Sequence, residues 1–292
     1  MARDEKEQSM DGGITRPRPV ARITRGTPAS DGAGVKLNRV IGTAELDAVD
    51  PFLMLDEFRS DDAADYIAGF PDHPHRGFET VTYMIAGRMR HGDNKGHTGL
   101  LEAGSVQWMT AGRGIVHSEM PEQEDGLMQG FQLWVNLPAK DKMIAPRYQE
   151  IPPKEIPSVA LAGGVTAKVI AGDIGDTRGP INGIATDPTL LDLALPQGAS
   201  LALPVARGHN VFLYAFEGEA AIGEAATRLP RGSIAVLGEG DGILIAAPTS
   251  AARVLVAAGR PLNEPVARYG PFVMNTPEQI RQALLDYQLG RL

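Results

Sequence analysis

Two pairs of residues in the first half of the sequence could bind a metal ion. His73 and His75 stand two residues apart, and so do His117 and Glu119. Side chains at positions i and i+2 of an extended strand point to the same face, so each pair can direct both groups at one point. If the strands that carry the pairs lie side by side, three imidazoles and one carboxylate converge. The spacing therefore predicts a metal site.

The lack of cysteine limits which metals such a site would hold. The chain has no Cys among its 292 residues, which excludes disulfides, thiolate ligands and a cysteine nucleophile. Nitrogen and oxygen ligands suit Fe(II), Mn, Co, Ni or Cu, whereas a closed zinc site is usually tetrahedral and often rich in thiolates. Four protein ligands on an octahedral ion would leave two positions open, at which a substrate or dioxygen could bind.

The composition is that of an ordinary globular protein with many turns. A length of 292 residues corresponds to about two domains, and 43% of the residues are hydrophobic. The net charge of −8 argues against direct binding of nucleic acid or anionic lipid, because both require a basic surface. The charged N-terminus lacks the apolar core of a secretory signal, and no apolar run reaches the length of a membrane helix. We therefore expect a cytoplasmic protein without a membrane partner.

Short runs of β-branched and aromatic residues predict an all-β fold. Phe52–Phe58, Phe78–Ile85 and Phe131–Leu137 are such runs, and glycines separate many of the segments between them. Strands at intervals of roughly ten residues are typical of a β-sandwich or barrel. Nothing between Val35 and Leu137 predicts a long helix.

The second half of the sequence repeats the pattern of the first. Asn210–Phe216 resembles Phe78–Ile85, and Pro230–Leu237 resembles Glu102–Met109, at corresponding points of the strand order. This similarity predicts an internal duplication. The second half contains a single histidine, His209, and neither metal-binding pair, so we expect its domain to lack metal ligands.

Five prolines between residues 138 and 157 indicate an extended connector between the two halves. We therefore expect a disordered tail over residues 1–19, an N-terminal domain with the metal site over 20–145, a linker over 146–160 and a C-terminal domain over 161–292.

One helix is expected, at the C-terminus. Thr276 is placed as an N-cap, Pro277 as the first helical residue and Gln279 as the partner in a capping box. Gly290 is a suitable residue to end the helix. We expect this helix to pack on the β-domains.

At the metal-binding pairs the chain resembles the cupin superfamily and, within it, closely resembles the pirin family. The resemblance is carried by Phe52–Phe58, Phe70–Tyr83, Gly104–Glu119, Gly130–Pro138 and Gly270–Thr276. It implies a bicupin, in which two β-barrel (jelly-roll) domains lie face to face with a short C-terminal helix. It also implies a mononuclear iron in the first barrel, with His73, His75, His117 and Glu119 as its ligands. Fe(II) is the metal expected, with Mn, Co, Ni, Cu or Zn as alternatives.

Glu79 is the position at which two cupin patterns differ. In many cupins the glutamate that follows the His-x-His motif is a ligand, and Glu79 matches it, whereas pirins take the carboxylate from the second motif, at Glu119. An unbroken strand would turn Glu79 to the same side as His75, but Gly77 can break the alternation. We expect Glu79 to be structural and Glu119 to be the ligand.

The resemblance implies two functions of different classes. One is an Fe(II) dioxygenase that cleaves quercetin-type flavonols, with a small aromatic substrate, dioxygen and Glu119 as the general base that takes the flavonol hydroxyl proton. The alternative is a non-enzymatic regulatory protein whose iron state controls binding to a transcription factor or a metabolic enzyme. A shared fold and site serve both, so family resemblance does not separate them.

Several other polar residues have simpler interpretations. His91 and His97 lie in a glycine-rich polar segment that predicts a surface hairpin, and His209 is expected in a loop. The segment Gly238–Gly242 looks like a phosphate-binding loop, but no helix follows to hold a phosphate, so a hairpin turn is expected. The basic segment Arg16–Pro19 is expected to be part of the solvated tail.

Overall fold

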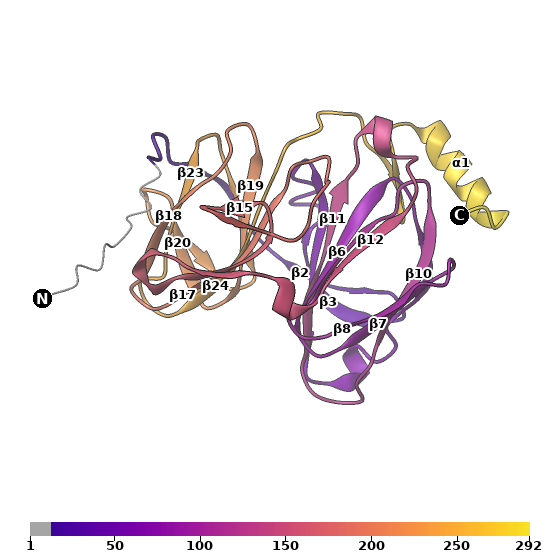
Figure 1. Cartoon of the computed structure of the whole chain (residues 1–292), viewed down its shortest axis with the longest axis horizontal. Coiled ribbons are helices and arrows are strands. Elements are labelled where there is room, and N and C mark those ends of the chain that lie inside the picture. Colours follow the sequence, from indigo (N-terminus) through magenta and orange to yellow (C-terminus); the bar gives the residue numbers. More distant parts are fainter. Residues whose placement is uncertain (1–12) are drawn as a thin grey trace, which may run out of the picture.

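The structure, a computed structural model, describes residues 13–292 and consists of two β-barrels with one helix at the far side of the first. In Figure 1 the first barrel is purple to magenta, the second is orange, and the C-terminal helix is yellow. The predicted all-β bicupin fold is confirmed. No helix in this part of the chain is long and apolar enough to span a bilayer.

The first barrel is made of two antiparallel sheets that face each other. The strand order of its large sheet is β12 (Arg147–Ile151), β9 (Val106–Thr110), β6 (Phe78–Ala86), β11 (Met128–Asn136), β4 (Phe52–Ser60), β3 (Val35–Ile41) and β2 (Thr27–Asp31). The order of its small sheet is β5 (Phe70–His75), β10 (Ile115–Pro121), β7 (Met89–Asp93) and β8 (Thr98–Leu101).

The second barrel repeats this arrangement strand for strand. The order of its large sheet is β1 (Val20–Arg25), β22 (Ser233–Leu237), β19 (Asn210–Glu217), β24 (Ala252–Gly259), β17 (Thr189–Leu195), β14 (Thr166–Ala171) and β13 (Ser158–Ala160). The order of its small sheet is β18 (Ser200–Pro204), β23 (Gly242–Ala246), β20 (Glu219–Ile222) and β21 (Thr227–Pro230). The segments that sequence similarity had paired, β6 with β19 and β9 with β22, occupy the same places in the two sheets, as a duplication predicts.

Short elements complete the chain. They are the strand pairs β15 (Asp173–Ile174) with β16 (Thr177–Arg178) and β25 (Ala267–Tyr269) with β26 (Phe272–Met274), the 3-10 turns η1 (Ala63–Asp65), η2 (Ala139–Asp141), η3 (Pro153–Glu155) and η4 (Ala162–Gly164), and the helix α1 (Pro277–Gln288). The predicted capping box of α1 is present: the Thr276 side chain accepts from the Gln279 amide, and the Gln279 side chain accepts from the Thr276 amide.

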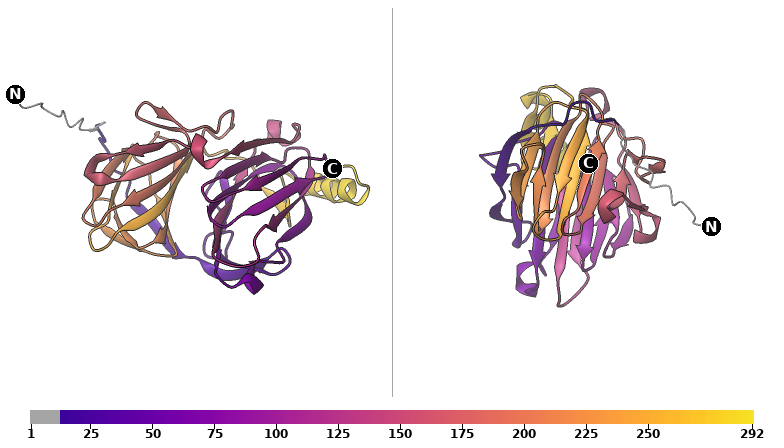
Figure 2. Two further views of the ribbon diagram at one scale, coloured as in Figure 1. Left: turned by 60° about the horizontal axis from the view of Figure 1, so that its bottom comes forward. Right: turned by 90° about the vertical axis from the view of Figure 1, so that its left-hand side faces the viewer.

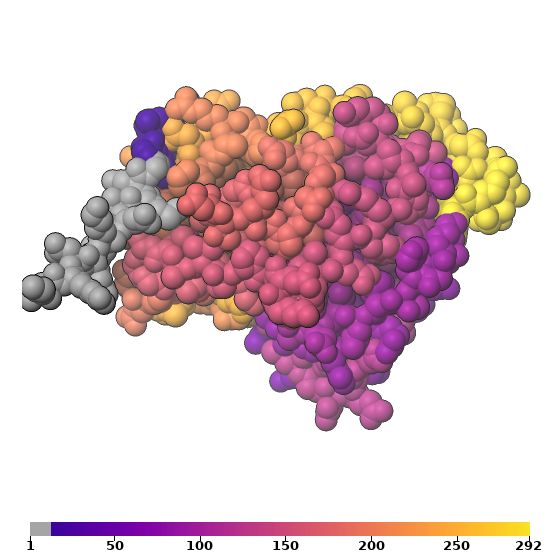
Figure 3. All heavy atoms as spheres, viewed as in Figure 1, coloured from indigo at the N-terminus to yellow at the C-terminus, as the bar shows by residue number. Residues whose placement is uncertain are grey.

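The two ends of the chain exchange barrels. Strand β1 pairs with β22 and so takes the place in the second barrel that β12 has in the first. The C-terminal segment instead lies on the first barrel, where Phe272 forms a bridge with Arg76 and Asp286 of α1 forms a 2.8 Å ion pair with the same arginine. Figures 2 and 3 show the indigo N-terminal residues against the orange barrel and the yellow C-terminal segment against the purple and magenta one.

This exchange corrects the expected domain boundaries. Residues 13–25 belong to the second barrel, whereas the segment from β25 to α1 belongs to the first. The expected linker 146–160 instead supplies two edge strands, β12 in the first barrel and β13 in the second. Residues 13–19, expected in a disordered tail, contact the second barrel, and residues 1–12 lie outside the described part. An edge strand joins a sheet through backbone hydrogen bonds, which a hydrophobic pattern does not reveal.

The large sheets of the barrels pack against each other through a common apolar core. Val81 and Tyr83 of β6 meet Phe212 and Tyr214 of β19 in this core. Two hydrogen bonds cross it in opposite directions: the Tyr83 hydroxyl donates to Asp192 Oδ2 at 2.6 Å, and the Tyr214 hydroxyl donates to Glu57 Oε2 at 2.5 Å. The barrels are therefore joined by matching buried polar contacts as well as by apolar area.

Candidate metal centre

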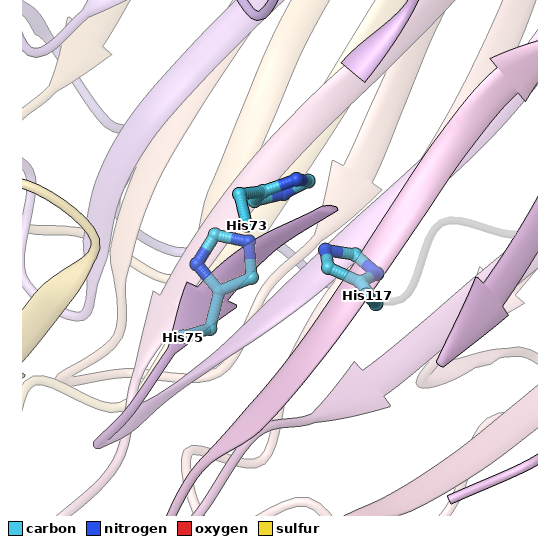
Figure 4. A group of neighbouring side chains, drawn as sticks. All are labelled: His73, His75 and His117. Atoms are coloured by element: carbon cyan, nitrogen blue, oxygen red, sulfur yellow. The ribbon is translucent and has the colours of Figure 1, made fainter. Parts of the chain in front are cut away.

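Three histidines converge on the inner face of the small sheet of the first barrel. Strands β5 and β10 are antiparallel neighbours, with His117 opposite His73 and Ile115 opposite His75. One ring nitrogen of each histidine lies within 4.8 Å of one from each of the others, and Figure 4 shows the three rings turned toward a common point. The side-by-side strands that the spacing argument required are therefore present.

The carboxylate of Glu119 is near this group but held separately. The pairing of β10 with β5 shifts between His117 and Glu119, so the regular alternation is interrupted between the two residues. Glu119 Oε1 accepts a 2.8 Å hydrogen bond from the Thr82 hydroxyl, and Oε2 accepts a 2.9 Å bond from Gln132 Nε2. The carboxylate is not one of the ligand atoms within 4.8 Å of one another, so its role as fourth ligand stays a prediction.

The histidine nitrogens fit the needs of a divalent cation. His75 Nδ1 and both ring nitrogens of His117 are buried and have no hydrogen-bond partner among residues 13–292. His73 Nδ1 lies 2.9 Å from the Pro71 carbonyl, which can only accept, so Nδ1 carries the proton and Nε2 keeps its lone pair. Burial lowers the pKa of His117 to about 4 and holds the pKa of His75 well below its usual value. Both rings are therefore uncharged at neutral pH, and each can donate a nitrogen lone pair to a metal ion.

Glu79 faces the other way. It is buried on β6, opposite Thr110 on β9, and accepts a 2.6 Å hydrogen bond from the Thr110 hydroxyl. Val81 and Tyr83, which follow on the same face of the strand, lie in the core between the barrels. The strand is interrupted at Gly77, where φ is +89° and a Cβ atom would come within 1.9 Å of a backbone carbonyl oxygen. The alternation is therefore broken where the sequence suggested, and Glu79 points away from the histidines.

A cavity of about 560 Å³ opens beside the histidines and Glu119. Aromatic side chains line part of it, and the ring of Trp134 lies 5.4 Å from that of His75. The guanidinium group of Arg268 lies over Trp134, 4.9 Å from the ring centre, and forms no ion pair with a carboxylate of the described chain. Arg39, by contrast, is neutralised by a two-point contact with Asp56 at 2.7 and 2.9 Å. Of the two arginines that line the cavity, Arg268 is therefore the one without a carboxylate partner among residues 13–292, and its Nη1 makes only a long 3.4 Å hydrogen bond to the Leu53 carbonyl.

The structure adds residues that sequence reasoning missed. Thr82 and Gln132 fix Glu119, and Arg268 reaches the cavity from β25, far away in the sequence. Alternation along β6 and β11 could have placed the first two inside the barrel, but not against Glu119. His91, expected on a surface hairpin, is instead fully buried, with Nε2 2.7 Å from Glu150 Oε1, while His97 is exposed as expected.

The second barrel carries apolar residues at the equivalent positions. Strands β18 and β23 correspond to β5 and β10, and their facing residues are Leu201 with Ile245 and Leu203 with Ile243. These side chains pack in the core of that barrel.

Two cupin-type barrels in one chain, the first with three converging histidines, define a bicupin. The Pirin sequence family matches residues 34–135, and the family described as the Pirin C-terminal cupin domain matches residues 190–292. The chain belongs to the pirin family.

Individual relatives agree with this assignment over nearly the whole chain. A pirin-like protein of Caulobacter vibrioides is 54% identical over 276 residues, which cover 94% of this chain and 99% of the relative. The Homo sapiens pirin is 45% identical over 265 residues, covering 89% and 88%. A crystal structure described as quercetin 2,3-dioxygenase from Acinetobacter baumannii is 33% identical, with a TM-score of 0.86 and coverage of 94% and 98%.

Proposed function

We propose that this protein is a metal-dependent dioxygenase that cleaves quercetin-type flavonols, with Fe(II) as its metal. The observation that carries the proposal is the group of three converging histidines beside a 560 Å³ cavity, which His73, His75 and Glu119 line. His75 and His117 are buried and have ring nitrogens without a hydrogen-bond partner in the described chain. The similarity to the Acinetobacter baumannii structure that is described as a quercetin 2,3-dioxygenase supports the choice of reaction.

His73, His75 and His117 would hold the ion, with Glu119 as the fourth ligand. A bound metal would supply Lewis acidity and access to the redox chemistry of dioxygen. Mn, Co, Ni, Cu and Zn are the alternatives, because the three imidazoles do not by themselves select one of these metals.

Glu119 is the residue proposed to take the proton of the flavonol 3-hydroxyl group. Each of its oxygens accepts one hydrogen bond, from Thr82 or Gln132, and each keeps a lone pair with which it can accept a proton. These two partners come from the opposite sheet and fix the direction in which the carboxylate points. A base held in this way needs little reorientation when the substrate enters.

The cavity suits a flat aromatic molecule with polar substituents. Its volume lies within the range of about 300–1,000 Å³ that is usual for small-molecule sites. Trp134 gives the cavity an aromatic wall, and Arg268, which lies over its ring, can bind a phenolic or phenolate oxygen. The substrate would thus lie between the histidines and Arg268.

The test is aerobic turnover of a panel of flavonols by protein whose ferrous iron content has been measured. We expect flavonol loss to match oxygen consumption, and Glu119→Gln to lower the rate by about a hundredfold or more while iron is retained. Absence of turnover across the panel in iron-loaded protein would instead favour the non-enzymatic regulatory role.

A further inference from the structure

A second cavity, of about 480 Å³, lies in the second barrel and does not share a residue with the metal cavity. Its polar lining consists of Arg16, Arg18, Arg207, His209 and Glu239 together with Asn210. The basic N-terminal segment, the lone histidine of the second half and the glycine-rich loop Gly238–Gly242 are separate in the sequence. The fold brings all three to one place.

Arg18 is a buried charge in the wall of this cavity. Only 2% of the residue is exposed. Its terminal nitrogens donate to the carbonyls of Gly238 and Ala206, both at 2.9 Å, while Nε has no partner. No carboxylate of residues 13–292 lies within 4.0 Å of the guanidinium group. Asp241 and Glu239 act on the guanidinium group only from a distance. A buried cation without a direct carboxylate partner is costly, so this position favours a bound anion.

Other positive groups surround the opening of the cavity. Arg207 is exposed and forms a 2.8 Å ion pair with Asp241, and Arg16 is exposed with Glu239 at 3.9 Å. Three arginines stand against Glu239 and Asp241 here, which leaves a formal excess of one positive charge in a chain whose net charge is −8. This contrast would draw an anion to the cavity.

His209 adds a polar group to the wall. The residue is 8% exposed, its Nδ1 has no hydrogen-bond partner in the described chain, and its Nε2 lies 3.7 Å from Asp187 Oδ2. Neutral imidazole still has one N–H group that can donate to an anion. Both Arg18 and His209 therefore line the cavity with a buried, unpartnered nitrogen.

We propose that this cavity binds the phosphate group of a small soluble phosphorylated molecule. Guanidinium groups match phosphate oxygens in geometry and charge, and the three arginines of the lining offer several such donors to one phosphate group. Gly238–Gly242 connects β22 to β23, which lie in different sheets, so it is not the hairpin turn that was expected. A strand and not a helix follows it, so arginines rather than a helix N-terminus hold the phosphate.

Calorimetric titration of the full-length, metal-loaded protein with inorganic phosphate tests this site. Phosphate replaces chloride during the titration, so that the ionic strength stays constant. We expect a single saturable binding event. Arg16→Gln and Arg207→Gln should each weaken it about tenfold, because each removes a charge-assisted contact. Both side chains are exposed, so these variants are expected to fold. Arg18→Gln should abolish binding, and its circular dichroism shows whether the fold is kept.

Two controls locate the site. Arg228→Gln removes an equally exposed arginine that pairs with Glu219 in the same barrel, and phosphate should bind this variant as it binds the wild type. His117→Ala should also bind phosphate unchanged, which separates this cavity from the metal centre.

The proposal is overturned by the absence of saturable binding, by full affinity in the Arg16→Gln, Arg207→Gln double variant, or by loss of binding in His117→Ala. Tighter binding of malonate than of phosphate or glycerol phosphate would overturn the assignment to phosphate.

Discussion

The hydroxyl of Thr82 donates a 2.8 Å hydrogen bond to Glu119 across the interior of the first barrel. Thr82 belongs to β6 in the large sheet and Glu119 to β10 in the small sheet, so the contact joins the two sheets at the candidate metal centre. The proposed base is therefore oriented by the sheet opposite the histidines.

Thr82→Val should lower the turnover of a flavonol about tenfold, because it removes a hydrogen bond to a charged group while keeping the shape of the side chain. Iron content should not change, since the histidines are untouched. Steady-state kinetics and metal analysis of the same sample measure both. Thr110→Val is the matched control, because its hydroxyl donates to Glu79 on the opposite face of the sheet. Equal loss of turnover in both variants would refute a specific role for Thr82.

Glu79→Gln should leave iron content unchanged and alter the pH dependence of stability. Burial raises the pKa of the Glu79 carboxyl above its ordinary value of 4.5. Between pH 4.5 and the raised pKa the folded protein binds more protons here than the unfolded chain, so this group lowers stability as pH rises through that window. Gln cannot ionise, and the variant should lose less stability over the same window. Urea unfolding from pH 4.5 upward measures the difference, and loss of iron from the variant would contradict the orientation of Glu79.

Arg268→Met should raise the KM for a flavonol about fivefold with little change in kcat, because the guanidinium group, which lies over Trp134, is proposed to bind the ligand away from the reacting atoms. Quenching of tryptophan fluorescence by the flavonol provides an independent binding measurement. The chain has two tryptophans, Trp134 and Trp108, and Trp134 is the one that lines the cavity. Arg113→Met, outside the residues that line the cavity, serves as the control. An unchanged KM would remove Arg268 from the ligand site.

The two tyrosines between the barrels should differ in their contribution to stability. Asp192 keeps a two-point contact with Arg253 when Tyr83 is changed, whereas Glu57 keeps only Gln129 when Tyr214 is changed. Tyr214→Phe should therefore cost about 2 kcal/mol of unfolding free energy and Tyr83→Phe about 1 kcal/mol. Urea denaturation measures both values, and the reverse order would show that Arg253 does not compensate for the lost hydroxyl.

The sequence was sufficient for the features that depend on local periodicity. Same-face spacing placed His73, His75 and His117 together, and a capping box at Thr276 located the helix. The partners of Glu119 could not be found in this way, because their positions depend on how two sheets pack. The pairing of β1 with the second barrel could not be predicted from the sequence either. The burial pattern of β1 alternates only weakly, and its position depends on an open edge of the sheet. His91 is polar in a polar segment, yet it shares the buried face of β7 with Met89.

The central claim is that the three histidines hold a metal that serves dioxygen chemistry on a flavonol. The most direct measurement is oxygen consumption with quercetin by protein loaded with one equivalent of ferrous iron, compared with His117→Ala treated in the same way. We predict that oxygen and quercetin are lost in equal amounts with the wild type, and that the variant neither retains the iron nor consumes oxygen. An iron-loaded wild type that leaves quercetin and other flavonols intact, or a His117→Ala variant of full activity, would contradict the account.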